Sequence, residues 1–169
     1  LSVARIANQQ YIQGNGGMLA LTKAINALEA MLNDPDFEII EDEFKSTIYD
    51  LIGTAYYHRY QVGGNISDLD IAISRHKKAI SKTPPNSPDL AGYLNNLGSG
   101  LKMRFAVTGQ GDDLNAAILL YEEAISKTSS DSLRLASYLT NLGGSFRNRF
   151  SITGQIDDLN AAISYHQEA

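Results

Sequence analysis

The chain has 169 residues, of which 43% are hydrophobic and 20% charged, and it carries a net charge of −5. This much apolar material excludes a disordered chain, and the acidic balance argues against nucleic-acid binding. No run approaches the roughly 20 apolar residues of a membrane span, so no membrane partner is expected. The chain has no cysteine, which excludes disulfides, thiolate metal sites and a cysteine nucleophile. The predicted location is cytoplasmic (intracellular).

Residues 1–34 read as a degenerate first repeat. The stretch GNGGML (14–19) resembles the corner of a helical hairpin, and ALTKAINALEAML (20–32) predicts its second helix. The N-terminus shows no signal pattern and no initiator methionine, and the final AAISYHQEA stops inside a helical pattern. We therefore expect a fragment of a larger protein.

Three further repeats follow, at about 37–82, 87–127 and 132–169, the last one truncated. Residues 91–124 and 136–169 are identical at 20 of 34 positions, with an offset of 45 residues. The first repeat instead fits at an offset of about 48. A repeat of this length predicts a solenoid, in which each repeat buries its apolar face against its neighbours.

Each repeat reads as two helices joined at a glycine. Leu94, Leu97, Leu101 and Phe105 lie on one helical stripe, and corresponding residues do so in the neighbouring repeats. The glycines of RYQVGG, RFAVTG and RFSITG are expected to end the first helices. We expect Ser67, Asp112 and Asp157 to cap the second helices. The stretch SKTPPNSPDL (81–90) separates two repeats. The predicted fold is an all-α superhelix (solenoid) of about four helical hairpins, forming a single array over 1–169.

LNNLGSGL (94–101) and LTNLGGSF (139–146) resemble the first-helix signature of tetratricopeptide repeats (TPR). The second helix is similar as well, because Ala117, Tyr121 and Ala124 have the small–aromatic–small spacing of that family. Histidine replaces the aromatic residue at His76 and His166.

The length of the repeat is closer to the long TPR arrays of kinesin light chains, and to fungal arrays that accompany a caspase-like CHAT domain. HEAT-like repeats have a similar length and stay open as an alternative. The Leu-Gly and small-residue signatures favour the TPR interpretation.

No catalytic, cofactor or metal site emerges from the residues. His76 and His166 occupy equivalent repeat positions on the buried side of the second helix, where a packed or edge histidine is a simpler interpretation than a ligand. GNGG lacks the strand and the Lys-Ser/Thr of a phosphate loop. The arginines of the corner (Arg59, Arg104, Arg149) are expected to pair with Asp68, Asp113 and Asp158, or to bond helix-end carbonyls. We predict that the chain is not an enzyme.

The resemblance to the TPR family implies a concave groove lined by the first helices. Asn96 and Asn141 match asparagines that some family members use to hold a peptide backbone or terminal carboxylate. Lys102 and Arg147 add positive charge, and arginine grips a carboxylate with two hydrogen bonds. The implied peptide-binding residues are Asn95, Asn96, Ser99, Lys102, Asn141, Arg147, Asn148, Tyr57 and His58.

These observations leave three functional hypotheses. The first is a noncatalytic protein–protein interaction module that binds a peptide in the groove, where Lys102 and Arg147 favour an acidic one. The second is a structural spacer that self-associates through its repeat ends. The third is a regulatory arm of a larger protein whose enzyme domain, such as a CHAT-type protease, lies outside this chain. Repeat scaffolds bind many unrelated ligands, so the fold alone does not discriminate between these three hypotheses.

Overall fold

The structure, a computed structural model, describes residues 17–169. These residues form seven α-helices and one short 3-10 helix, and no strand occurs among them. The all-α class and the hairpin pattern predicted from the sequence are therefore confirmed. The expected first helix of the degenerate repeat, and residues 14–16 of its corner, lie outside the described residues.

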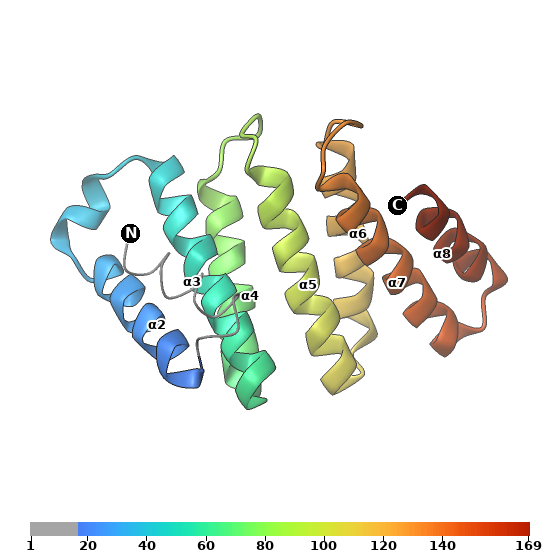
Figure 1. The fold of residues 1–169 in the computed structure, drawn as a ribbon, viewed down its shortest axis with the longest axis horizontal. Helices are drawn as coiled ribbons and strands as arrows, with labels where there is room; N and C mark the ends of the chain where they lie inside the picture. Colours follow the sequence, from blue (N-terminus) through green and yellow to red (C-terminus); the bar gives the residue numbers. More distant parts are fainter. Residues whose placement is uncertain (1–16) are drawn as a thin grey trace. The chain divides into compact units, whose positions relative to one another are not determined.

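The chain divides into two compact units between Pro85 and Asn86. The N-terminal unit contains α2 (Met18–Leu32), η1 (Pro35–Ile39), α3 (Asp42–Gly63) and α4 (Ile66–Lys82). The C-terminal unit contains α5 (Leu90–Thr108), α6 (Gly111–Ser126), α7 (Leu135–Thr153) and α8 (Ile156–Glu168). Figure 1 shows these elements in chain order, coloured from blue to red.

In the N-terminal unit, α3 packs against both α2 and α4. The apolar stripe of α2 buries Leu21, Ile25 and Leu28, and the following η1 turn buries Phe37. Phe37 joins Leu28 and Ile48 in one core cluster, and its ring meets that of Tyr49 edge-on, with centroids 5.7 Å apart. The turn between α2 and α3 is thus part of the core.

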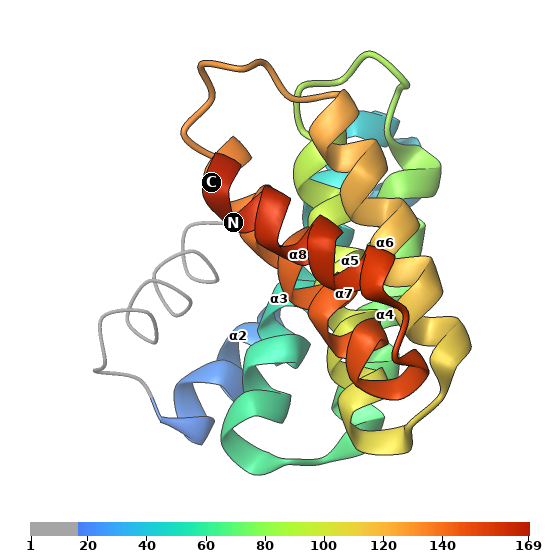
Figure 2. The same cartoon turned by 90° about the vertical axis from the view of Figure 1, so that its right-hand side faces the viewer.

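In the C-terminal unit, α5 pairs with α6, α7 pairs with α8, and α6 also contacts α7. Figure 2 shows α8 alongside α7. Because helices of this length bury only one stripe of side chains, each hairpin covers its neighbour's apolar stripe. The fully buried large side chains include Leu114, Tyr121, Leu139 and Leu142.

The three hairpin corners end their first helices at a glycine, as the sequence predicts. Gly64, Gly109 and Gly154 have φ angles of 69°, 71° and 68°, in the left-handed region. Each glycine N–H donates to the carbonyl four residues earlier, at 2.7–2.8 Å. A side chain is strained in this conformation, so glycine here fixes the place where the chain turns.

The predicted N-caps were wrong by two residues. The caps are Asn65, Gln110 and Gln155, directly after the corner glycines, whereas Ser67, Asp112 and Asp157 lie inside the first turn. The glycine reverses the chain so tightly that the next helix begins at once. Of the three caps, Asn65 accepts a hydrogen bond from the Ser67 N–H with its side chain.

The predicted pairing of arginine with aspartate occurs at all three corners. Arg104 donates from Nε and Nη2 to the two carboxylate oxygens of Asp113, each at 2.7 Å. Arg59 with Asp68 and Arg149 with Asp158 repeat this geometry at 2.6–2.9 Å. The aspartates are buried, so each fork ties the end of one helix to the start of the next.

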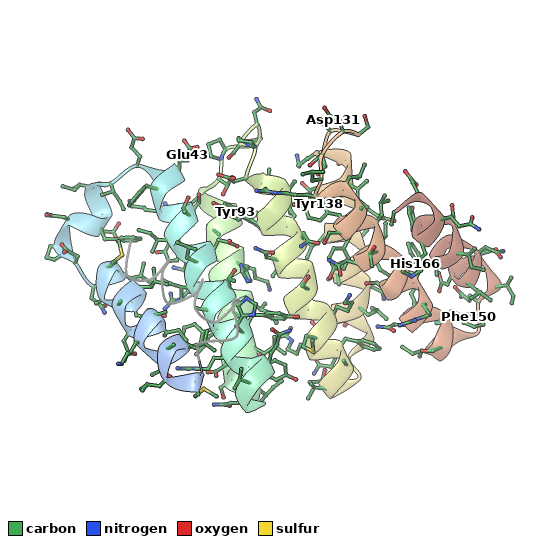
Figure 3. All side chains as sticks on the ribbon, viewed as in Figure 1. Glu43, Tyr93, Asp131, Tyr138, Phe150 and His166 are labelled. Atoms are coloured by element: carbon green, nitrogen blue, oxygen red, sulfur yellow. The ribbon has the colours of Figure 1, made fainter. Side chains whose placement is uncertain are left out.

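The two histidines predicted to be equivalent lie in different surroundings. His76 is 1% exposed and its Nδ1 lies 2.8 Å from Asp50 Oδ1. His166, which is labelled in Figure 3, is exposed, although its imidazole lies beside Gly143 of α7. The prediction of a buried position is therefore wrong for His166. Among the described residues no further helix covers α8 in the way that α7 covers α6.

Candidate functional site

The predicted peptide-binding residues fall on both units. Tyr57 and His58 lie on α3 in the N-terminal unit, and the other seven lie on α5 and α7 in the C-terminal unit. The α5 and α7 helices contact one another directly. Figure 3 labels Tyr93 and Tyr138, which mark the first turns of these two helices. We use the name α5–α7 face for the polar residues that these helices share: Asn95, Ser99, Lys102, Asn141 and Arg147.

Three residues of the α5–α7 face form a hydrogen-bonded chain. Asn141 Nδ2 on α7 donates to Asn95 Oδ1 on α5 at 2.9 Å. Lys102 Nζ, two turns further along α5, donates to Asn141 Oδ1 at 3.3 Å. Since a primary amide has two donor hydrogens, Asn95 and Asn141 keep donor capacity for another molecule. The asparagines thus join two neighbouring helices on a surface that solvent reaches.

A tyrosine from the second helix lies beneath this chain. Tyr121 of α6 is fully buried, and its hydroxyl donates to Ser99 Oγ on α5 at 3.1 Å. Lys102 Nζ lies 5.7 Å from the centroid of the Tyr121 ring. An ammonium over an aromatic face is weakly attracted to it, so the ring supports Lys102 without neutralising its charge.

The positive charge of this face has no carboxylate partner among residues 17–169. Burial lowers the pKa of the Lys102 ammonium, and the nearby Arg147 guanidinium lowers that pKa further. Within this part of the chain, no ion pair involves either Lys102 or Arg147. Two cations therefore share one surface, and one of them has lost part of its hydration.

The remaining predicted residues are Asn96, Asn148, Tyr57 and His58. Asn96 is half-buried and makes contacts of its own. The backbone carbonyl of Asn148 accepts from Ser151 at 2.6 Å. In the N-terminal unit, His58 Nδ1 lies 2.9 Å from Gln61 Oε1, and the Tyr57 ring meets the His58 ring edge-on at 5.9 Å. Burial raises the pKa of Tyr57, so its hydroxyl stays protonated.

Comparison with known proteins gives a structural match. No protein-family model matches the chain, and no curated protein matches it in sequence. A crystal structure of MamA, a TPR-like helical protein, is similar with a TM-score of 0.58 and 16% sequence identity. The match covers 98% of this chain and 73% of the MamA chain.

The chain has a TPR-like helical repeat fold. At 16% identity, the likeness to MamA concerns the fold alone. In the described part of the chain, no group of three or more histidine, aspartate or glutamate side chains is placed to hold a metal ion. No helix in that part is both long and apolar enough to cross a membrane.

Sequence reasoning missed one contact of the TPR-like hairpins. It treated His76 and Tyr121 as packing residues only, yet each directs a polar atom onto the first helix of its hairpin, toward Asp50 and Ser99. A signal was present, because both are polar-tipped rings at equivalent positions, and each lies against a glycine. A buried ring with a polar tip needs a hydrogen-bond partner.

Proposed function

We propose that the chain is a noncatalytic protein-interaction module that binds an acidic peptide segment on the α5–α7 face. The observation that supports this most strongly is Lys102, a half-buried cation beside Arg147 that is hydrogen-bonded to an amide instead of a carboxylate. Burial removes part of the water that stabilises the charge of Lys102. A carboxylate placed next to this ammonium replaces that stabilisation.

The neighbouring asparagines suit a peptide. Asn95 and Asn141 are held in place by their mutual hydrogen bond. Their remaining amide hydrogens can donate to a backbone carbonyl of the peptide. Because these side chains are already ordered, little conformational entropy is lost when a peptide binds. The proposed mode combines backbone contacts from the asparagines with charge contacts from Lys102 and Arg147.

The finer identity of the repeats also belongs to this proposal. The 45-residue spacing supports a single array of long TPR repeats, similar to those of kinesin light chains. The corners with an arginine and an aspartate supply the extra length. No feature of the described residues favours a spacer or a regulatory arm of an enzyme over an interaction module, so those hypotheses stay predictions, as does the cytoplasmic location.

Binding of two labelled peptide pools tests the proposal. One pool carries aspartate or glutamate at alternate positions, and the other carries lysine or arginine at the same positions. We expect fluorescence anisotropy to show tighter binding of the acidic pool, weakened about tenfold in Lys102→Gln and in Arg147→Gln. Raising the salt concentration should weaken binding further, because these charges are partly exposed.

The matched control is Lys127→Gln. Lys127 lies in the same unit, at the end of α6, and its Nζ is 3.7 Å from Glu123. This variant also removes one positive charge, but at a site outside the α5–α7 face. It should bind the acidic pool as the wild type does. Equal binding of both pools, or equal weakening in all three variants, would reduce the effect to general electrostatics and overturn the proposal.

A further inference from the structure

The turn between α2 and α3 departs from the repeat in a way that its counterparts do not. Residues 36–45 (DFEIIEDEFK) align at the 45-residue spacing with 81–90 (SKTPPNSPDL) and 126–135 (SKTSSDSLRL). Each of those connections contains one acidic residue, whereas residues 36–45 contain five acidic residues and four bulky apolar ones. Core packing accounts for Phe37, but it does not account for the five acidic residues or for the exposed ring of Phe44.

A surface cavity lies at this turn. It has a volume of about 180 Å³, and most of its wall is apolar. The lining residues are Met31, Asp34, Asp36, Phe37, Ile40, Phe44 and Ile48. An apolar cavity of roughly 150 Å³ is large enough to take up benzene, so this one fits a single aromatic or branched side chain.

The cavity is held open by the core of the N-terminal unit. Phe37 and Ile48 belong to the core cluster and are 5% and 0% exposed. Buried Lys45 donates from Nζ to the Glu38 carbonyl at 2.8 Å, which ties the turn to α3. By contrast, Phe44 is 42% exposed, so an apolar wall faces solvent. A pocket that is ordered before binding loses little entropy when it is filled.

The charge around the cavity selects the kind of partner. Six of the ten residues 34–43 are acidic, and none is basic. Among the described residues, lysines pair with Glu38 and Asp42, but no ion pair reaches Asp36 or Glu43. Figure 3 shows Glu43 in the first turn of α3. Cations that flank an apolar side chain complement this arrangement.

We propose that this cavity, the α2–α3 pocket, binds a basic segment of a partner protein that inserts one bulky apolar side chain between lysines or arginines. The apolar side chain contacts Phe37 and Phe44, and the flanking cations lie against Asp34 and Asp36. The pocket differs from the α5–α7 face in residues and in charge, so the two proposals fail or succeed separately.

The three methionines of the chain provide a direct readout. Met31 lines the pocket, whereas Met18 and Met103 do not. The probe is a heptapeptide with a central phenylalanine and two lysines at each end. We expect it to shift the methyl resonance of Met31 in the labelled full chain while that of Met103 stays in place. Replacing the lysines by glutamate, or the phenylalanine by serine, should abolish the shift.

Variants separate the pocket from general attraction. Asp36→Lys reverses a charge at the wall, and Phe44→Ala removes an exposed apolar wall, so both should weaken peptide binding about tenfold. Asp112→Lys makes the same charge change at an exposed position of α6 and should leave binding unchanged. A wild-type Met31 signal that does not respond, or equal loss in Asp36→Lys and Asp112→Lys, would overturn the proposal. So would a Met31 shift that appears on concentrating the protein without peptide, because a second copy would then fill the pocket.

Discussion

Glycines in the middle of the first helices let an aromatic ring approach the backbone. A Cβ atom at Gly98 would lie 2.9–3.2 Å from the Tyr121 ring, and one at Gly53 would lie 2.7–2.9 Å from the His76 ring. Real Cβ atoms essentially never come within 3.0 Å of another atom, so an added methyl group would force the ring or the backbone to move. The Leu-Gly pair of the sequence signature therefore marks a packing contact between the two helices of a hairpin.

We predict that Gly98→Ala destabilises the protein by about 1–2 kcal/mol. Overpacking a rigid site costs about 1–3 kcal/mol, and the better helix propensity of alanine returns only part of that cost. Tyr121 cannot move aside, because it is fully buried and its hydroxyl is bonded to Ser99. Chemical denaturation monitored by circular dichroism measures the change.

Gly144→Ala serves as the control for this prediction. Gly144 also lies in a helix interior, but the nearest atom to a methyl group added there is Lys102 Nζ at 4.0 Å. This variant should gain about 0.5–1 kcal/mol from helix propensity alone. Similar effects of the two substitutions would show that the ring contact does not limit the residue at Gly98.

The arginine–aspartate pair of the last corner predicts a pH dependence. Hydrogen bonds from Arg149 hold the pKa of the Asp158 carboxyl below its ordinary value of 3.8. Since the folded-state pKa is the lower one, the pair stabilises the fold fully above the unfolded value. Its contribution is lost as the pH falls through the folded-state pKa.

Asp158→Asn should therefore lower the free energy of unfolding by roughly 1.5–3 kcal/mol at neutral pH, the usual size for a hydrogen bond to a charged group. The difference from the wild type should shrink as the pH falls below about 4. Asp157→Asn, at the exposed neighbouring position, should change stability much less. A difference that is constant between pH 7 and pH 2 would contradict the role assigned to the charged pair.

Each hairpin corner combines a left-handed glycine with a helix that begins immediately after it. At Gly109 the φ angle is 71°, and the N–H donates to the Phe105 carbonyl at 2.8 Å. A side chain in this region meets the following carbonyl and costs about 1–2 kcal/mol. The corner is therefore sensitive to backbone conformation rather than to space, since no atom from the rest of the fold, local backbone aside, lies within 4 Å of the added methyl.

Gly109→Ala is expected to lower the free energy of unfolding by about 1–2 kcal/mol. Gly111→Ala, two residues later, is the matched substitution, because that glycine also has open space but no positive φ angle. It should be neutral or slightly stabilising. Thermal unfolding of both variants distinguishes them, and an unchanged midpoint for Gly109→Ala would contradict the conformational explanation.

The hairpins could be predicted from the sequence because two local signals coincide with a repeat. The apolar stripes predicted the first helices, and the corner glycines predicted where those helices end. The recurrence of Arg104 and Asp113 near the corner predicted their pairing, with bonds to helix-end carbonyls as the alternative. The predicted N-caps were wrong because aspartate is a preferred N-cap residue and glutamine is not, which favoured Asp112 over Gln110. The exposure of His166 was missed because a repeat pattern assumes that every copy has the same neighbours.

The candidate sites were predicted only in part. The resemblance to the TPR family assigned Asn95, Lys102 and Asn141 to a peptide-binding groove, and that role stays a prediction. The structure shows that the three side chains are hydrogen-bonded between α5 and α7. The resemblance did not predict these hydrogen bonds, because they depend on the distance between α5 and α7. The α2–α3 pocket was not predicted at all, since it is formed by a turn that differs from the repeat.

The central claim is that the α5–α7 face binds acidic peptides. Titrating the methyl-methionine-labelled full chain with the tightest-binding peptide of the acidic pool tests it most directly, because Met103 follows Lys102 on α5 and Met31 reports on the other unit. We expect a saturable shift of the Met103 resonance, no shift of the Met31 resonance, and loss of the effect in Lys102→Gln but not in Lys127→Gln. A Met103 resonance that stays fixed, or that shifts equally in Lys102→Gln, would contradict the claim.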